Sequence, residues 1–330
     1  MDGEKIIFLI SQPRAGSTFL QRLLQNHPEI HSAPEPWIML HPLYGLKDSG
    51  FEAEYNAWWA QTATQKFYQS LSKRKDFYFE GVRRMYEPIY ETALQDSGKA
   101  FFLDKTPRYY HIIPELLRTF PKAKFIILLR NPISVFGSIL TTWVKDDLHK
   151  VRNFESDLFK APDCLLSGVE ILRKNSCSVS SICYEKILDD PEKHLRKLCH
   201  SIGISFSSRM LIPRNSPQLG YGYKDQTVDS LNTVIMRSHP EQWLGKFKNP
   251  QHWRLAQDYL LSINERTFTG LGYSLSETKE ALEAIKPNKL ALYRTKPLES
   301  LLDKNSSYKG IKNSYARLGL TFLAKKMGFC

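Results

Sequence analysis

The sequence predicts an α/β fold of three layers, in which helices cover both faces of a parallel sheet. Short apolar runs alternate with segments of helical periodicity along most of the 330 residues. Parallel strands need long crossover connections, and helices normally supply them. With 42% hydrophobic residues, the chain also has enough apolar material for a sizeable core.

The strands of this sheet are marked by aliphatic and aromatic runs that end at a polar or charged residue. Strands are expected at 5–10, 100–103, 124–129 and 178–183, with a short extended piece at 30–34. Helices are expected at 17–26, 112–120, 133–144, 165–174 and 191–202. The stretch 51–97 combines helical periodicity with many aromatic residues, which predicts a helical insertion or lid.

The net charge of +12 is concentrated near the C-terminal end of the sequence. Residues 286–330 hold ten Lys and Arg against two Asp and Glu, a net charge of +8. The preceding residues have no long basic stripe of the kind that lines a nucleic-acid groove, which argues against a nucleic-acid partner. We expect 276–330 to be a basic C-terminal extension. It is either an amphipathic appendage that contacts an anionic membrane or an acidic partner, or a set of helices packed on the body with solvated lysines.

Cysteine and histidine usage indicates reduced thiols and no metal site. The five cysteines are odd in number and lack Cys-x-x-Cys spacing, and they form no zinc-binding spacing with the nine histidines. The first strand begins at residue 5, which leaves no room for a signal peptide, and no apolar run reaches 18 residues. We therefore expect a cytoplasmic protein without a metal.

The first strand leads into a loop, Ser11-Gln12-Pro13-Arg14-Ala15-Gly16, that opens the helix beginning Ser17-Thr18-Phe19. This layout points free backbone N–H groups at one spot, where the helix dipole favours an anion. Glycine permits a close backbone approach, arginine supplies a charged fork, and the hydroxyls add hydrogen bonds. We expect a phosphate site, although the same residue types also serve as ordinary caps and turn residues. Because no lysine follows Gly16, this is not a Walker loop, and a magnesium-bound nucleoside triphosphate is disfavoured.

A second basic motif, Arg130-Asn-Pro-Ile-Ser-Val-Phe-Gly-Ser138, follows the strand at 124–129. It offers a charged fork and a hydroxyl for a second phosphate; alternatively, Arg130 pairs with a surface carboxylate and Ser138 is a small packing residue. Lys105 and Tyr184 likewise follow apolar strands. Because the carboxyl ends of parallel strands meet at one edge of a sheet, where ligands collect, we expect these residues to share a site.

The two motifs together, 13–20 and Arg130-x7-Ser138, resemble the paired nucleotide-binding motifs of sulfotransferases that use 3′-phosphoadenosine 5′-phosphosulfate (PAPS). Tyr184-Glu-Lys-Ile-Leu-Asp-Asp-Pro is similar to the Tyr-Glu-Asp-Leu segment of that family, except that Lys186 stands where the pattern has aspartate. The resemblance covers roughly residues 5–250 and is closest in pattern to the protein-tyrosine and carbohydrate-type bacterial branch. It implies a P-loop-like sheet and a sulfotransferase domain over 1–275.

The resemblance also implies a donor site with two ends. The 5′-phosphosulfate would be held by Arg14, Ala15, Gly16, Ser17, Thr18 and Phe19, and the 3′-phosphate by Arg130 and Ser138. Tyr184 would lie near the adenine or the 3′-phosphate, or else be an ordinary core tyrosine at a strand end. Thr227 is a further candidate, in a segment where related enzymes close a loop over the nucleotide.

Sulfuryl transfer resembles phosphoryl transfer, because negative charge moves to the leaving phosphate and catalysis rests on positioning and charge stabilisation. Lys105 is the expected cation, assisted by Arg14, because lysine is a compact point charge; otherwise it is a solvated loop lysine. Glu35 in Ala-Pro-Glu-Pro-Trp is the expected catalytic base, because prolines fix its backbone and the similar position in protein-tyrosine sulfotransferases holds a catalytic glutamate. His31 and His41 remain alternatives, as does a structural, salt-bridged Glu35.

The sequence thus predicts an enzyme that moves a sulfuryl group from PAPS to an acceptor hydroxyl without a metal. The acceptor class stays open between protein tyrosine, glycan, and lipid- or carrier-bound alcohol. Two alternatives remain. One is a P-loop small-molecule kinase, which would need magnesium and a Walker lysine. The other is a noncatalytic nucleotide-binding membrane adaptor that uses the basic extension.

Overall fold

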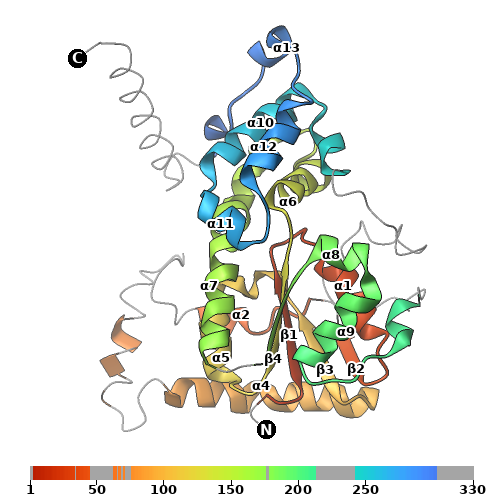
Figure 1. Ribbon diagram of the computed structural model, residues 1–330. Helices are drawn as coiled ribbons and strands as arrows, with labels where there is room; N and C mark the ends of the chain where they lie inside the picture. Colours follow the sequence, from red (N-terminus) through yellow and green to blue (C-terminus); the bar gives the residue numbers. More distant parts are fainter. Residues whose placement is uncertain are drawn as a thin grey trace. The chain divides into compact units, whose positions relative to one another are not determined.

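The structure, a computed structural model, describes residues 3–33, 35–44, 62–64, 66–67, 70, 76–175, 178–212 and 242–302. These residues contain a five-stranded parallel sheet in the order β2-β3-β1-β4-β5 (Figure 1). The strands are β1 Ile6–Ser11, β2 Ile30–Ala33, β3 Phe101–Lys105, β4 Lys124–Leu129 and β5 Val179–Cys183. The predicted α/β class is confirmed, and the extended piece expected at 30–34 is an edge strand of the sheet.

The chain divides into two compact units. The first consists of 1–130 and 164–238 and contains the whole sheet, and the second consists of 131–163 and 239–330. Helices of the first unit are α1 Ser17–Gln25, α2 Leu40–Tyr44, α4 Asp76–Ser97, α5 Ile113–Thr119, α8 Tyr184–Asp189 and α9 Pro191–Ser201. Helices of the second are α6 Pro132–Ile139, α10 Pro250–Ser262, α11 Glu265–Gly270, α12 Leu275–Glu283 and α13 Lys289–Tyr293, while α7 Ala161–Lys174 runs from the second unit into the first. In the part of the chain that the structure describes, no helix combines the length and apolar character needed to cross a bilayer.

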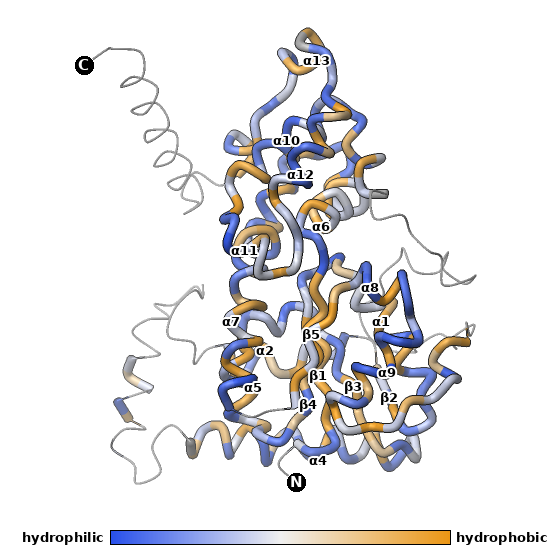
Figure 2. Tube along the Cα trace, viewed as in Figure 1, coloured by the Kyte–Doolittle hydropathy of each residue, from blue (hydrophilic) through white to orange (hydrophobic). Residues whose placement is uncertain are grey.

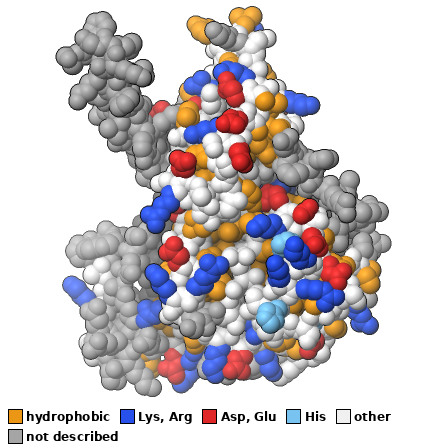
Figure 3. Space-filling model, viewed as in Figure 1, with side chains coloured by type: hydrophobic (Ala, Val, Ile, Leu, Met, Phe, Trp, Pro, Cys, Tyr) orange, Lys and Arg blue, Asp and Glu red, His pale blue; other side chains and the backbone are white. Residues whose placement is uncertain are grey.

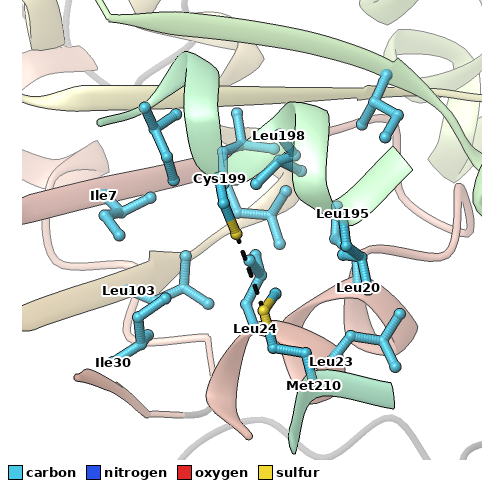
Figure 4. Close-up of a cluster of buried hydrophobic side chains, with 14 of the residues drawn as sticks. Ile7, Leu20, Leu23, Leu24, Ile30, Leu103, Leu195, Leu198, Cys199 and Met210 are labelled. Atoms are coloured by element: carbon cyan, nitrogen blue, oxygen red, sulfur yellow. Dashed lines mark hydrogen bonds between the residues drawn. The ribbon is translucent and has the colours of Figure 1, made fainter. Parts of the chain in front are cut away.

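One face of the sheet is covered by α1 and α9. Side chains alternate between the faces of a strand, so Ile7 and Leu103 point to this side, where they meet Leu24 of α1 and Leu198 of α9 (Figure 4). Helix α1 buries its leucines at the i, i+3, i+4 spacing of an amphipathic helix. Strands β1 and β4 carry the hydrophobic colour along most of their length (Figure 2), as expected for strands that are covered on both faces.

The opposite face is packed with aromatic rings. Phe8 of β1 contacts the rings of Tyr109, Phe120 and Phe125, with centroids 5.5–6.0 Å apart. Helix α4 adds Tyr90, whose ring lies 6.0 Å from that of Phe120. Because both faces are covered, the first unit has the three layers that the sequence predicts.

Three elements differ from the sequence expectation. Strand β3 does not end at residue 103, because Asp104 and Lys105 continue the ladder with Phe8 and Leu9 of β1. A short helix, α8, starts at Tyr184 directly after β5, where no separate helix was expected. The helix expected at 133–144 is α6 followed by a π-turn at Leu140–Val144.

The second unit is built around α10. Tyr259 packs on Phe136 of α6 with ring centroids 4.8 Å apart, and the indole N–H of Trp253 donates to the carbonyl of Leu282 on α12 at 2.8 Å. Leu298 and Leu301 are buried as well. The described part of the expected basic extension, 276–302, therefore contributes buried side chains to this unit, and 303–330 lies outside the described residues. On the face drawn in Figure 3, basic and acidic side chains are interspersed within each unit.

Candidate active site

The loop between β1 and α1 turns through two residues with positive φ, Arg14 at 67° and Gly16 at 93°. The N–H of Ala15 closes the turn by donating to the carbonyl of Gln12 at 3.1 Å. A side chain at Gly16 has no space, since a Cβ there would lie 2.3 Å from ring carbons of Tyr184. The close approach expected at Gly16 is therefore made by a tyrosine ring of the protein itself.

The N-terminus of α1 begins directly after this turn. Leu20 makes the first intrahelical bond, donating its N–H to the carbonyl of Gly16 at 3.1 Å. The N–H groups of Ser17, Thr18 and Phe19 precede that bond, and Gly16 as the N-cap residue has no side chain with which to cap them. Their partial positive charge favours an anion at this end of the helix.

Tyr184 closes one side of the loop. Besides Gly16, its ring contacts Phe19 edge to face at 5.8 Å, and the guanidinium of Arg130 lies 4.3 Å above it. Burial raises the pKa of the Tyr184 phenol above its ordinary value, with a smaller opposing effect of Arg130. The phenol is therefore neutral at physiological pH and can donate a hydrogen bond.

Arg130 joins the two predicted motifs. Its Nη1 donates to the backbone carbonyl of Arg14 at 2.9 Å. Its Nε lies 3.9 Å from Oε1 of Glu185, too far for a hydrogen bond, and this buried Nε has no hydrogen-bond partner among the described residues. Arg130 thus combines a fixed position beside the loop with an N–H group that can still donate a hydrogen bond.

The predicted base and the predicted cation lie in direct contact. Nζ of Lys105 is 2.6 Å from Oε1 of Glu35 and 3.3 Å from Oγ1 of Thr18. Strand alternation turns Lys105 to the α1 face, and its side chain is only 3% exposed, so it is not a solvated loop lysine. Three sequence-predicted residues from α1, from β3 and from the segment after β2 therefore form one cluster.

The second oxygen of Glu35 is also engaged. The indole N–H of Trp37 donates to Oε2 at 3.1 Å. Trp37 has a φ of 56°, an uncommon value for a residue with a side chain, and the guanidinium of Arg108 lies 5.4 Å from its ring. The carboxylate is consequently held at both oxygens, by an ammonium and by an indole.

Sequence reasoning missed a buried carboxylate behind this cluster. Asp104 is fully buried and accepts hydrogen bonds from Tyr90, Thr106 and Tyr109 at 2.8–3.1 Å. Burial raises the pKa of Asp104 to about 6, while these hydrogen bonds and Lys105 oppose that increase. The sequence signal that could have revealed it is an aspartate directly after the apolar run 100–103. A charged residue continuing a buried strand needs hydrogen-bonding partners.

A second missed residue ties α1 to the strand that precedes Glu35. The amide nitrogen of Gln21 donates to Oγ of Ser32 at 2.7 Å and to the carbonyl of Ala33 at 2.8 Å. Both polar side chains are buried. A polar residue on the buried side of an apolar helix pattern was the available signal.

The other candidates are two histidines, a serine and a threonine. His31 packs on the ring of Phe102, near the start of β3, and burial lowers its pKa, as does Lys99. His41 is exposed on α2. Ser138 is buried on α6, which belongs to the second unit, and Thr227 lies outside the described residues. Among the described residues, no group of three or more His, Cys, Asp and Glu side chains is arranged to hold a metal ion.

Comparisons with known proteins agree on one family. The sequence model of the sulfotransferase family matches residues 7–208. Nodulation protein NoeE of Sinorhizobium fredii is 36% identical over 140 residues, which are 42% of this chain and 32% of that protein. Protein-tyrosine sulfotransferase 2 of Gallus gallus is 23% identical over 210 residues, 62% of this chain and 53% of its own length. The alignments thus span about a third and about half of these two relatives.

The solved structure of mouse sulfotransferase SULT7A1 complexed with PAP aligns with 83% of this chain and 89% of its own, at 18% identity and a TM-score of 0.45. The matched residues 7–208 cover more than half of the chain and include the β1–α1 loop, Glu35, Lys105, Arg130 and Tyr184. The chain therefore belongs to the sulfotransferase family.

Proposed function

We propose that this protein transfers a sulfuryl group from PAPS to an acceptor hydroxyl, with Glu35 as the base. The observation that carries this proposal is the contact of Lys105 with Glu35 and Thr18. A carboxylate, an ammonium group and the first turn of a helix with uncapped N–H groups lie together, which suits in-line transfer of a sulfuryl group from a departing phosphate to an acceptor hydroxyl.

The donor proposal is supported by unsatisfied polar groups that fit a ligand with two anionic ends. The N–H groups at 17–19 suit the 5′-phosphosulfate, together with the backbone of Ala15 and Gly16. The Nε of Arg130, which has no hydrogen-bond partner among the described residues, suits the 3′-phosphate, which arginine binds with its planar fork. The sequence motif assigns Ser138 to the same phosphate, and the aromatic ring of Tyr184 suits contact with the adenine or with that phosphate.

In the proposed mechanism Glu35 accepts the acceptor's hydroxyl proton while the acceptor oxygen forms a bond to sulfur. The bond between sulfur and the bridging oxygen breaks, and its electron pair stays on the departing phosphate. Lys105 and Arg14 stabilise the charge that develops there. For this, Lys105 moves its ammonium contact from Glu35 towards the bridging oxygen, which leaves the carboxylate available to take the proton.

The donor site is tested by titrating the protein with adenosine 3′,5′-bisphosphate (PAP) and with 5′-AMP in a calorimeter. We expect PAP to bind more tightly than 5′-AMP, because only PAP has a 3′-phosphate. Arg130→Lys should weaken PAP binding by roughly tenfold and leave 5′-AMP nearly unchanged, since a point charge replaces the fork. Arg196→Lys is the matched control, because that guanidinium also stacks on a ring, Phe206, but lies on α9. Absence of PAP binding, or equal effects of the two substitutions, would contradict the donor assignment.

The acceptor class is tested with ³⁵S-labelled PAPS and a panel of acceptors. The panel holds a tyrosine-containing peptide, which the name of the Gallus gallus relative suggests, an oligosaccharide, and a lipid alcohol in detergent. We expect label on one class. PAP binding without label on any class would favour a noncatalytic nucleotide-binding protein, and transfer from Mg-ATP instead of PAPS would favour a kinase.

A further inference from the structure

The segment that follows Glu35 is held by two hydrogen bonds from its backbone N–H groups to side-chain hydroxyls. The N–H of Trp37 donates to Oγ1 of Thr106 at 3.4 Å, and the N–H of Met39 donates to the phenol oxygen of Tyr109 at 3.1 Å. Both hydroxyls belong to the short stretch that leaves β3 after Lys105. The stretch 106–109 therefore directly follows Lys105 in the chain and also holds the segment 37–39 that follows Glu35.

Both hydroxyls in turn donate hydrogen bonds to the same carboxylate, that of Asp104. Thr106 donates to Oδ1 of Asp104 at 3.0 Å, and Tyr109 donates to Oδ2 at 3.1 Å. All three residues are fully buried, so water does not replace these bonds. Two chains of hydrogen bonds, here called relays, thus end on Asp104. One runs from the N–H of Trp37 through Thr106 to Oδ1, and the other from the N–H of Met39 through Tyr109 to Oδ2.

The relays bear directly on the conformation of Trp37. A tryptophan with a φ of 56° persists only when its surroundings hold it there, and the bond from its N–H to Thr106 is such a restraint. In this conformation the indole N–H reaches back two residues to Oε2 of Glu35. The hydrogen bond from Trp37 to Thr106 therefore also helps to orient the Glu35 carboxylate, through the indole N–H.

We propose that Asp104 is a positioning residue for Glu35, acting through Thr106 and Tyr109 on the segment 37–39. This rests on the proposed function only in its reference to Glu35 as the base, because the relays themselves follow from contacts within the protein. The functional consequence is that loss of either relay misorients Glu35 and lowers turnover, while the donor site between the β1–α1 loop and Arg130 keeps its affinity.

The structure offers a matched control on the same carboxylate. Tyr90 of α4 donates to Oδ2 of Asp104 at 2.8 Å and is as buried as Tyr109. Its ring contacts are with Phe102 and Phe120, on the aromatic face of the sheet, and not with the segment 37–39. Tyr90→Phe and Tyr109→Phe thus remove the same group from the same acceptor, but only the second breaks a relay.

The orientation of Trp37 can be measured without any turnover. The full-length protein is labelled with 5-fluorotryptophan, and its six tryptophans are observed by ¹⁹F NMR, with Trp37→Phe identifying the Trp37 resonance. Glu35→Gln should shift this resonance, because it changes the acceptor of the indole N–H. We expect Thr106→Val and Tyr109→Phe to shift it as well, whereas Thr106→Ser, which keeps the hydroxyl, and Tyr90→Phe should leave it in place.

Kinetics supply the second readout, with ³⁵S-PAPS and the acceptor class found in the panel. Thr106→Val and Tyr109→Phe should lower kcat roughly tenfold or more, as expected when a catalytic group is misplaced, with PAP affinity unchanged. Tyr90→Phe and Thr106→Ser should keep kcat within about a factor of two, by the same reasoning.

The outcomes separate this inference from the proposed function. If Thr106→Val and Tyr109→Phe leave the Trp37 resonance in place, or if Tyr90→Phe shifts it equally, the relay is refuted. If the resonance responds as expected but Glu35→Gln retains full turnover, the relay stands and the assignment of Glu35 as base fails.

Discussion

Gly16 illustrates how a single residue constrains the candidate site. It has a positive φ, and the ring of Tyr184 occupies the space that a side chain would need. The β1–α1 loop, Tyr184 and Arg130 are therefore packed as one assembly, held together by the ring and by the bond from Arg130 to the carbonyl of Arg14. A side chain added at Gly16 should therefore displace the Tyr184 ring and, with it, the guanidinium of Arg130 that lies over this ring.

Gly16→Ala should weaken PAP binding by tenfold or more, because the new methyl displaces the Tyr184 ring from beneath Arg130. Gly98→Ala is the matched control: Gly98 also has a positive φ, 62°, but its Cβ would meet nothing within 4 Å. Both substitutions should lower the free energy of unfolding by about 1 kcal/mol through backbone strain, with a further loss for Gly16→Ala from the clash with the Tyr184 ring, and only Gly16→Ala should affect the ligand. Calorimetric titration with PAP and urea unfolding measure the two effects, and equal PAP affinities would contradict this packing argument.

Asp104 is the residue whose protonation should affect stability. Burial raises its pKa from 3.8 to about 6, against the hydrogen bonds from Tyr90, Thr106 and Tyr109 and the charge of Lys105. Between these two values the native protein holds a proton that the unfolded chain has released, so stability falls as the pH rises. Well above pH 6 the Asp104 carboxyl is ionised in both the native and the unfolded state, and its titration no longer changes the free energy of unfolding.

The variant Asp104→Asn has no titrating group at this position and should lack this slope. Relative to the variant, the wild-type free energy of unfolding should decrease by about 2 kcal/mol between pH 4 and pH 7, which is most of the roughly 3 kcal/mol that the full shift represents at 1.36 kcal/mol per pKa unit. Urea unfolding across this pH range measures the difference. Parallel pH profiles for the two proteins would show that the Asp104 pKa is not raised.

At the scale of elements, the site depends on how α1 is fixed to β2. Gln21 donates from the middle of α1 to Ser32 and to the carbonyl of Ala33, and Ser32 in turn donates to the carbonyl of Leu103 on β3 at 2.8 Å. The helix that offers Thr18 and the strands that lead to Glu35 and Lys105 are linked by this buried chain of bonds.

Gln21→Leu should lower the free energy of unfolding by about 1–3 kcal/mol, because the carbonyl of Ala33 loses a buried donor. Asn26→Leu is the control, since the Asn26 side chain also donates to a carbonyl, that of Ile212 at 3.0 Å, but at an exposed position. It should change stability by about 0.5 kcal/mol or less. Urea denaturation compares them, and a smaller effect for Gln21→Leu than for Asn26→Leu would contradict the structural role of this bond.

At the scale of the whole molecule, the sequence predicts the regular parts well, because periodicity and strand-end residues are local signals. The positions of the five strands and of the loop at 12–16 follow from such signals, whereas the choice of Glu35 as a base acting with Lys105 rests on the resemblance to the sulfotransferase family. Asp104, Gln21 and the left-handed conformation of Trp37 do not, because each depends on partners distant in sequence, such as Tyr90 or Thr106. The predicted partnership of Arg130 with Ser138, and the domain boundary at 275, stay predictions.

We propose that Glu35 takes the acceptor proton during sulfuryl transfer from PAPS. The most direct measurement is single-turnover transfer of ³⁵S from saturating PAPS in the wild type, in Glu35→Gln, and in Glu80→Gln, where the lost carboxylate is also paired with a basic residue, Arg84, but on α4. We predict that Glu35→Gln loses about 100-fold or more in rate and still binds PAP, as expected for removal of a general base, while Glu80→Gln reacts like the wild type. Transfer by Glu35→Gln at the wild-type rate would contradict the account.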